Sequence, residues 1–270
     1  MAHKVRFVVP TLGKRVDWLH LMLRSVSNQG VDVDLVMVGP DTPELHEIAL
    51  EYGARFEVES GSSLSSAINQ GVAALEQDSE FVAWLGDDDV LAPGALQAAL
   101  RALEGEPEAP FCYGRLRYID EAGRSKWLAR PGRWAVPYAR WGVNFVPQPG
   151  SVIRRSAWNE VGGLDESLHN AMDHDLFLKL AALSSGVYVP RELASFRVHG
   201  GSISVRKDGQ SESDLVRSRY QPALGYRSAG IVRLVVMVTN RILLSVHSRI
   251  PGPTLPLVNE SHYFSSAYYA

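Results

Sequence analysis

Residues 81–96, FVAWLGDDDVLAPGAL, join a continuous apolar run to three consecutive aspartates. The run at 81–85 is typical of a strand that is buried on both faces of a parallel sheet. Asp87, Asp88 and Asp89 follow directly, at the carboxyl end of that strand, where open α/β sheets bind their ligands. Because three adjacent carboxylates repel one another, we expect them to hold a hard divalent cation, Mg²⁺ or Mn²⁺. An exposed acidic turn is the alternative.

Strand patterns alternate with helical patterns before this stretch. Apolar, β-rich runs typical of buried strands lie at 5–9 and 35–38, and a short strand is expected at 55–58. Apolar residues recur at helical spacing over 18–26, 45–49 and 64–75. This alternation predicts an α/β fold with a mainly parallel central sheet and helices on both faces.

The pattern changes after about residue 105, where GEPEAP forms a polar break. The sequence then predicts a hairpin at 111–128, an ordered aromatic-rich loop at 131–149 and a helix at 173–183. Two short strands at 188–189 and 194–198 and a polar loop at 206–214 are expected to follow. We therefore expect three regions: residues 1–105, residues 106–205, and a C-terminal helical tail over 206–270.

Composition excludes several classes of protein. The chain has 270 residues, a net charge of −3 and a single cysteine, Cys112. A basic nucleic-acid surface, a disulfide framework and a Cys-rich zinc site are therefore not expected. The apolar run near the N-terminus is too short for a signal-peptide core, and no window is apolar enough for a membrane span. These features predict a cytoplasmic location.

The segment 215–250 carries six arginines and no acidic residue. Two placements remain open for it. It forms a helix that packs on the domain or on a second subunit, which would make a homodimer. Alternatively, it forms a basic amphipathic helix at the inner face of an anionic membrane.

Five segments, taken in order, resemble the inverting, metal-dependent family 2 of the GT-A glycosyltransferases. The stretch at 81–96 is similar to the family's Asp-X-Asp region. The other segments are VVPT at 8–11, AINQG at 67–71, QPGSVIRRSAWNEVGGLDESLHNAMDHDLFLKLA at 148–181 and FRVHGGSIS at 196–204. The resemblance covers about residues 4–205 and implies the GT-A (Rossmann-like) fold.

This resemblance implies a nucleotide-diphosphate sugar as donor. The residues that it assigns to the donor are Pro10, Thr11, Asp41, Asn69, Asp87 and Arg197. Gly39-Pro40 stands where the family usually has a base-reading aspartate, so UDP, GDP and dTDP remain open. The implied ligands of Mn²⁺ or Mg²⁺ are Asp88, Asp89 and His199, while Gly86 replaces the first aspartate of the motif.

Asp173 is the candidate general base. At helical spacing it shares a face with the apolar Phe177 and Leu180, and the positive end of a helix dipole favours its ionised form. An N-cap is the alternative. The family has a Glu-Asp pair here, whereas this chain has Met172 before Asp173. Asp175, with Lys179 four residues on, is expected to form an ordinary surface pair.

These observations predict a transferase that moves a sugar to an acceptor hydroxyl with inversion, by metal-assisted single displacement. The acceptor would be a glycan, a lipid-linked molecule or a small molecule, in a pocket shaped by the aromatic residues of 127–145 and by Gln148. Bacterial surface polysaccharide assembly is a setting by analogy. The alternatives are a nucleotidyltransferase of related fold and a non-catalytic carbohydrate-binding protein. The loop at 11–15 has a single glycine, which disfavours triphosphate binding. A dehydrogenase would need G-x-G-x-x-G after the first strand, and this motif is absent there.

Overall fold

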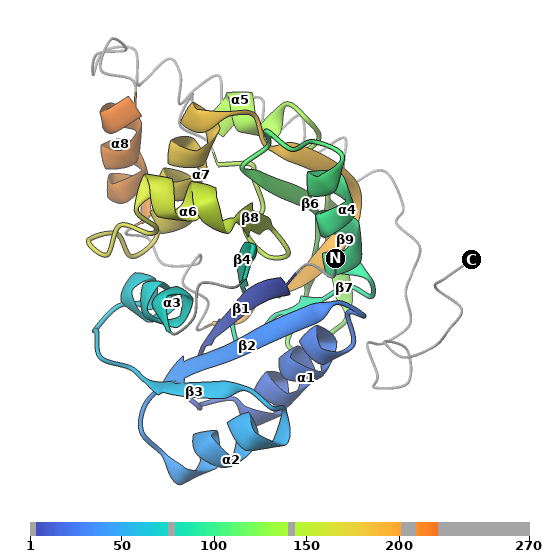
Figure 1. Cartoon of the computed structure of the whole chain (residues 1–270), viewed down its shortest axis with the longest axis vertical. Helices are drawn as coiled ribbons and strands as arrows, with labels where there is room; N and C mark the ends of the chain where they lie inside the picture. Colours follow the sequence, from blue (N-terminus) through green and yellow to red (C-terminus); the bar gives the residue numbers. More distant parts are fainter. Residues whose placement is uncertain (1–3, 75–78, 140–143, 201–208, 221–270) are drawn as a thin grey trace.

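The computed structural model describes residues 4–74, 79–139, 144–200 and 209–220 (Figure 1). Within these residues one nine-stranded sheet crosses the molecule. Helices cover both of its faces, which confirms the predicted α/β architecture.

The first half of the sheet is parallel. Its strand order is β3-β2-β1-β4, and the bounds are β1 Lys4–Pro10, β2 Asp32–Gly39, β3 Arg55–Val58 and β4 Phe81–Trp84. β1, β2 and β4 contain the largely apolar runs of the sequence, which burial between two helical layers explains. The edge strand β3, RFEV, is only partly buried and alternates polar with apolar residues.

The second half of the sheet is mixed. The order continues as β8-β6-β9-β5, with β7 paired to β6, and the bounds are β5 Val90–Leu91, β6 Phe111–Ile119, β7 Ser125–Ala129, β8 Val152–Arg154 and β9 Val187–Arg197. The β6–β7 hairpin is antiparallel, as predicted. However, the two short strands expected at 188–189 and 194–198 are one strand, β9, because its pairing with β6 continues between them at Glu192, opposite Arg115.

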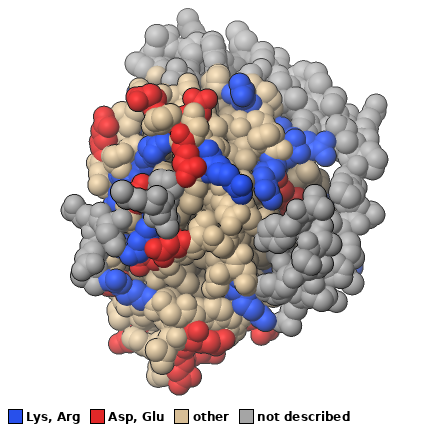
Figure 2. All heavy atoms as spheres, turned by 45° about the vertical axis from the view of Figure 1, so that its right-hand side comes forward, with Lys and Arg blue, Asp and Glu red and all other residues tan. Residues whose placement is uncertain are grey.

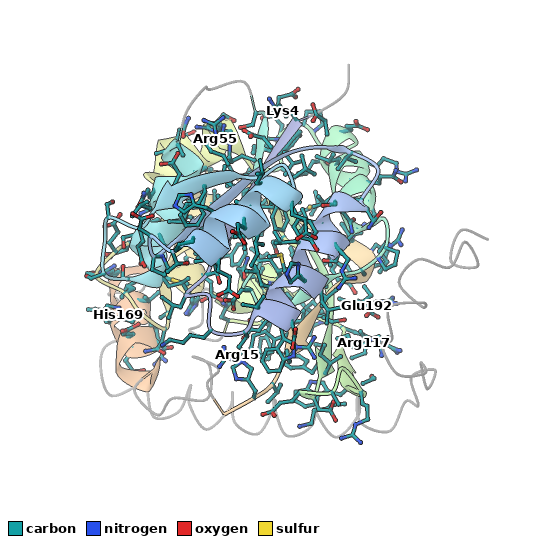
Figure 3. The ribbon with its side chains drawn as sticks, turned by 90° about the horizontal axis from the view of Figure 1, so that it is seen from below. Lys4, Arg15, Arg55, Arg117, His169 and Glu192 are labelled. Carbon is teal, nitrogen blue, oxygen red and sulfur yellow. The ribbon has the colours of Figure 1, made fainter. Side chains whose placement is uncertain are left out.

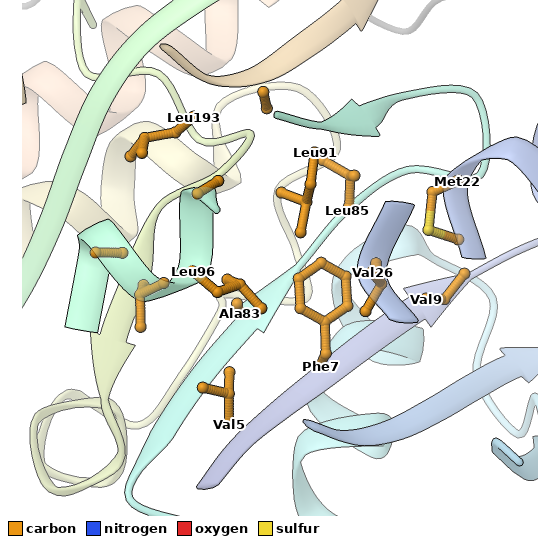
Figure 4. Close-up of a cluster of buried hydrophobic side chains, with 14 of the residues drawn as sticks. Val5, Phe7, Val9, Met22, Val26, Ala83, Leu85, Leu91, Leu96 and Leu193 are labelled. Atoms are coloured by element: carbon orange, nitrogen blue, oxygen red, sulfur yellow. The ribbon is translucent and has the colours of Figure 1, made fainter. Parts of the chain in front are cut away.

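Two clusters of buried side chains lie on the two faces of the sheet. On one face pack α1 (Val16–Ser27), α2 (Pro43–Glu51) and α4 (Ala95–Glu104), against side chains that include Phe7 and Leu91 (Figure 4). On the other face pack α3 (Leu64–Ala73), α5 (Ala135–Ala139), α6 (Arg155–Val161) and α7 (Met172–Leu183).

The packing of α3 on β1 explains the glycine, Gly71, that ends the AINQG segment at 67–71. A Cβ at this position would lie 2.4 Å from Val8 Cγ1. Real side chains do not approach so closely, so glycine is required for α3 to sit directly on β1. The segment therefore has a packing role in addition to any contact with a ligand.

The last described helix is α8 (Gly209–Tyr220), beside α7 (Figure 1). The prediction of a polar loop over 206–214 is wrong for 209–214, which lie in this helix. Only residues 215–220 of the arginine-rich segment are described, so both placements of the tail lie outside the described residues. No helix among the described residues is long and apolar enough to cross a membrane. Figure 2 shows basic and acidic side chains interspersed on one face.

Candidate active site

The three adjacent aspartates occupy a tight turn between β4 and β5. The amide of Asp89 donates to the carbonyl of Gly86 at 3.2 Å. A Cβ at Gly86 would lie 2.8 Å from Asp88 Oδ1, so a side chain there would displace this carboxylate. The turn therefore explains the glycine that replaces the first aspartate of the motif. Within this turn, each of the three carboxylates bonds a different residue: Thr11, His199 and Arg197.

Asp87 contacts the loop that follows β1. Thr11 Oγ1 donates to Asp87 Oδ2 at 2.6 Å, and the amide of Gly13 donates to Thr11 Oγ1 at 3.0 Å. Burial raises the pKa of Asp87, and the Thr11 hydroxyl partly offsets this. The contact joins the carboxyl ends of two neighbouring parallel strands, β1 and β4.

Asp88 contacts His199, which follows β9. Asp88 Oδ2 lies 2.6 Å from His199 Nε2, and His199 Nδ1 lies 3.3 Å from Arg15 Nη2. The His199 ring is also 5.2 Å from the ring of Trp18 on α1. Arg15, which is labelled in Figure 3, immediately precedes the first residue of α1. Residues from three distant parts of the chain thus meet here.

Asp89 is buried and held by β9. The amide of Arg197 donates to Asp89 Oδ1 at 2.8 Å. Burial, with the neighbouring charge of Asp88, raises the pKa of Asp89 well above its usual range. Arg197 Nε donates to the carbonyl of Asp88, and Nη1 donates to the carbonyls of Asp120 and Glu121. The Arg197 guanidinium therefore ties this turn to the β6–β7 hairpin.

Asp173 lies in the first turn of α7. Its Oδ1 accepts from the amide of His174 at 2.8 Å, and its Oδ2 accepts from Asn144 Nδ2 at 3.1 Å. Burial raises the pKa of Asp173, although His174 and these hydrogen bonds act in the opposite direction. A carboxylate with a raised pKa, held by two donors, has the chemistry that a general base requires.

The pKa of Tyr118, on β6, is influenced by both Asp89 and Asp173. Its pKa is raised first by burial, and then by the charges of Asp89 and Asp173. Coulomb interactions weaken with distance and screening, so the phenol lies within electrostatic reach of both carboxylates. Trp127 of β7 stacks on the Tyr118 ring at 4.2 Å, and Trp127 is 42% exposed.

Asp175 and Lys179 form the predicted pair, with Lys179 Nζ 2.8 Å from Asp175 Oδ2. The expected location at the surface is wrong, because Asp175 is fully buried. Asp175 also accepts from Tyr220 Oη at 3.1 Å and lies 3.4 Å from Arg219 Nη1. Both of these partners belong to α8. Asp175 is therefore a buried link between two helices.

Other predicted site residues have different partners. Asp41 is exposed and lies 2.8 Å from His46 Nε2. Both amide atoms of Asn69 bond the backbone of Leu164, which joins α3 to the segment before α7. Pro10 is the last residue of β1. Gln148 Nε2 donates to the carbonyl of Trp84, at the end of β4, at 2.9 Å.

The sequence profile of the family "Glycosyl transferase family 2" matches residues 7–162. This match covers more than half of the chain. The chain belongs to this family.

Two curated relatives agree with this assignment to the family 2 glycosyltransferases. The chain is 31% identical over 193 residues to the O-antigen biosynthesis protein RfbC of Myxococcus xanthus, covering 68% of this chain and 15% of RfbC. It is 25% identical over 162 residues to the chondroitin synthase of Escherichia coli, covering 59% of this chain and 23% of the synthase. The chain thus spans less than a quarter of either relative.

Solved structures share the fold of this family 2 chain. S. aureus TarS 1–349 in complex with UDP-GlcNAc has a TM-score of 0.59 and 13% identity, with 82% of this chain and 71% of that chain covered. The same protein in complex with UDP also has a TM-score of 0.59, at 13% identity over 85% of this chain and 74% of that chain. At this identity the similarity shows the fold alone.

A divalent cation fits the Asp88–His199 pair. No group of three His, Cys, Asp or Glu side chains in the described parts of this family 2 chain could hold a metal by itself. Nevertheless, Asp88 and His199 place one oxygen and one nitrogen ligand side by side. Mg²⁺ is usually bound by one or two carboxylates together with phosphate oxygens of the substrate. The pair therefore suits a cation that arrives with a nucleotide diphosphate.

Sequence reasoning missed four residues of this region in the family 2 chain: Arg15, Trp18, Tyr118 and Asn144. Arg15 carried a usable signal, because it is basic and follows the predicted Thr11 loop. Trp18 was assigned to the apolar face of a helix, and its contact with His199 bridges distant segments. Tyr118 and Asn144 carried no signal, since nothing local distinguishes them from other strand and loop residues.

Proposed function

We propose that this chain transfers a sugar from a nucleotide-diphosphate sugar to an acceptor hydroxyl, with inversion at the anomeric carbon and the help of Mn²⁺ or Mg²⁺. Residues 1–105 would bind the nucleotide, and residues 106–205 would bind the acceptor. The family assignment favours this reaction over a nucleotidyltransferase or a non-catalytic carbohydrate-binding protein.

One observation carries the donor side of the proposal. Arg15, Asp88 and His199 meet although they come from three distant segments, and the Thr11–Asp87 contact lies on the same turn. Arg15 supplies a positive charge for the diphosphate, while Asp88 and His199 would hold the cation. When bound, this cation would offset the negative charge that grows on the leaving diphosphate. Arg197 would support the diphosphate mainly by holding the turn.

Asp173 supplies the acceptor side of the reaction. Its carboxylate takes the proton from the acceptor hydroxyl as that oxygen bonds the anomeric carbon. The bond from this carbon to the diphosphate oxygen breaks at the same time, on the opposite face of the sugar, and the nucleotide diphosphate leaves. Asn144 and the amide of His174 fix the orientation of the carboxylate. Such positioning is a large part of enzymatic rate enhancement.

The stacked Tyr118–Trp127 pair supports a carbohydrate acceptor. Trp127 is partly exposed, and Tyr118 lies within the electrostatic reach of Asp173. Sugar rings pack on flat aromatic faces, so this pair would form one wall of the acceptor pocket. The names of the relatives RfbC and chondroitin synthase favour a polysaccharide acceptor.

The first donor to test is UDP-GlcNAc, because TarS shares the fold and has been solved in complex with it. We would screen UDP-, GDP- and dTDP-sugars by thermal shift, with and without Mn²⁺. A ligand that binds only the folded state raises the melting temperature.

The chain should then release free nucleotide diphosphate on turnover with a carbohydrate acceptor. Release of pyrophosphate from a nucleoside triphosphate would instead support the nucleotidyltransferase, and the absence of any nucleotide-dependent shift would contradict donor binding.

A further inference from the structure

Glu212 on α8 accepts hydrogen bonds from three successive backbone amides. Its Oε2 lies 3.0 Å from the amide of His169, 2.6 Å from that of Asn170 and 3.0 Å from that of Ala171. Burial raises the pKa of Glu212, but these donors outweigh burial and leave its pKa below the usual range. The glutamate is therefore a strong acceptor at one specific point of the backbone.

That point is the start of α7, which carries Asp173. The first amides of a helix have no partner within the helix and are usually bonded by the side chain of the N-cap residue. The N-cap residue of α7 is Ala171, which makes no side-chain hydrogen bond to the helix. Glu212 bonds the amide of the N-cap residue itself and the amides of the two residues before it, so it fixes the entry of the chain into α7. Its negative charge also complements the positive end of the helix dipole.

The other end of α8 is attached to α7 as well. Arg219 Nη1 lies 2.6 Å from Asp165 Oδ2 and 3.4 Å from Asp175 Oδ1. Tyr220 Oη donates to Asp175 Oδ1 at 3.1 Å. Between the two ends, Val216 is fully buried against apolar residues of neighbouring elements, namely Ala139, Leu168, Ala171 and Leu178. A helix held at three points in this way is a fixed part of the fold.

Asp173 lies between the two polar attachment points, Ala171 and Asp175. Its own hydrogen bonds come from the adjacent His174 amide and from Asn144. Fraying of the first turn of α7 would move the carboxylate and the His174 amide together. A shift of about 1 Å in a catalytic group can cost about a hundredfold in rate.

We propose that Glu212 is a positioning residue for Asp173: from α8 it holds residues 169–171, where the chain enters α7, and so fixes the carboxylate that would face the acceptor. The inference rests on the proposed function, in which Asp173 is the base. It assigns α8 a part in the reaction although α8 does not itself contact the substrates.

The charges around this turn allow a second readout. Asp173 is influenced by His174 and Tyr118 and accepts from Asn144. Around α8 lie Glu212, His169, Asp165, Asp175, Lys179 and Arg219. Glutamine at position 212 keeps an acceptor oxygen but removes a negative charge from the entry of the chain into α7, the helix that carries Asp173. The ionised form of Asp173 then becomes easier to reach, so its pKa should fall by about half a unit or less.

The experiment compares Glu212→Ala, Glu212→Gln and a matched control, Glu47→Ala, which changes an exposed glutamate on α2. We expect Glu212→Ala to lower kcat with UDP-GlcNAc about tenfold or more, with an unchanged KM for the donor. Glu212→Gln should recover most of kcat, and Glu47→Ala should behave like the unmodified chain. A purely structural role would be recognised by equal losses in both Glu212 variants, in proportion to the fall in melting temperature.

Two measurements do not depend on turnover. The first is hydrogen exchange of the amides of 172–175, which should quicken in Glu212→Ala. The second is the ¹³C NMR titration of the Asp173 carboxyl, which should move to lower pH in Glu212→Gln. If both are unchanged, the proposal is wrong whatever the transfer assay gives. Failure of the proposed function is distinguishable, because it would appear as full activity of Asp173→Asn.

Discussion

Two regions of this chain, 87–89 and 173–175, are both rich in aspartate but differ in the residues that surround them. Asp87, Asp88 and Asp89 are adjacent, and each is held by a residue from another part of the chain: Thr11, His199 and Arg197. Asp173 and Asp175 are two residues apart on α7. One is held by Asn144 and the helix backbone, while the other is buried against Lys179 and α8.

The difference teaches that the tertiary partners of a carboxylate decide its role. In the proposed function, the histidine and the nearby arginines around the turn after β4 would bind a cation and a diphosphate. At the start of α7, Asp173, held by Asn144, would accept a proton, whereas Lys179 and Arg219 pair with the buried Asp175. The following predictions would break or sharpen this comparison.

The largest effect should come from Asp173→Asn. General base catalysis contributes about 10²–10⁴-fold, so we expect transfer to fall by about a thousandfold. Because asparagine is nearly the same size, donor and Mn²⁺ binding should persist in the thermal-shift assay. Asp32→Asn, at the exposed start of β2, is the control. Near-normal turnover of Asp173→Asn would show that the base lies elsewhere.

Asp88→Ala should act on the donor side instead. Loss of this carboxylate removes a predicted cation ligand beside His199. We expect metal-dependent nucleotide binding to weaken by about a hundredfold, since second-shell changes alone cost about 10–100-fold in metal affinity. Isothermal titration of the nucleotide with and without Mn²⁺ measures this. Unchanged metal-dependent affinity would remove Asp88 from the donor site.

Asp175→Ala should act on stability. The fully buried Asp175 is the common partner of Lys179 and Arg219. Breaking a buried ion pair costs about 3–5 kcal/mol, but these two cations are partly exposed and remain solvated. We therefore expect the free energy of unfolding to fall by about 2–3 kcal/mol in denaturant titrations. An effect no larger than that of Asp32→Ala would return Asp175 to the role of a surface charge.

The smallest effect is on the pH profile. The base must be ionised, so transfer should be lost as the pH falls through the pKa of Asp173. Burial raises that pKa, and the acid limb of kcat/KM should therefore lie above about pH 4, the range of an ordinary aspartate. A limb below this range would mean that the hydrogen bonds from Asn144 and His174 outweigh burial.

Much of this protein was predictable from local patterns. The largely apolar runs at 5–9, 35–38 and 81–85 correspond to β1, β2 and β4, since a strand buried on both faces needs an apolar sequence, and the short strand expected at 55–58 is β3. Motif order predicted the family, and the profile match confirmed it. The functional assignments of Asp88, Asp173 and His199 stay predictions, but the structure brings Asp88 and His199 into contact.

Other features were beyond local patterns. The first part of α8, residues 209–214, was expected as a polar loop, and Val216 is the one fully buried residue in the described part of the helix. Its stability comes from Glu212, Arg219 and Tyr220 bonding α7, which no spacing within 209–220 reveals. The burial of Asp175 was missed for the same reason.

The sequence by itself determined which segments are buried, where the sheet ends in carboxylates, and to which family the chain belongs. Backbone periodicity and residue chemistry are local properties, so they can be inferred from neighbours along the chain. The tertiary structure alone decided which carboxylate meets a histidine, which meets an asparagine and which is neutralised by lysine and arginine. Apart from Asp175 with Lys179, which are four residues apart on α7, those pairings join residues as distant as Asp88 and His199, and they form only when distant segments pack together.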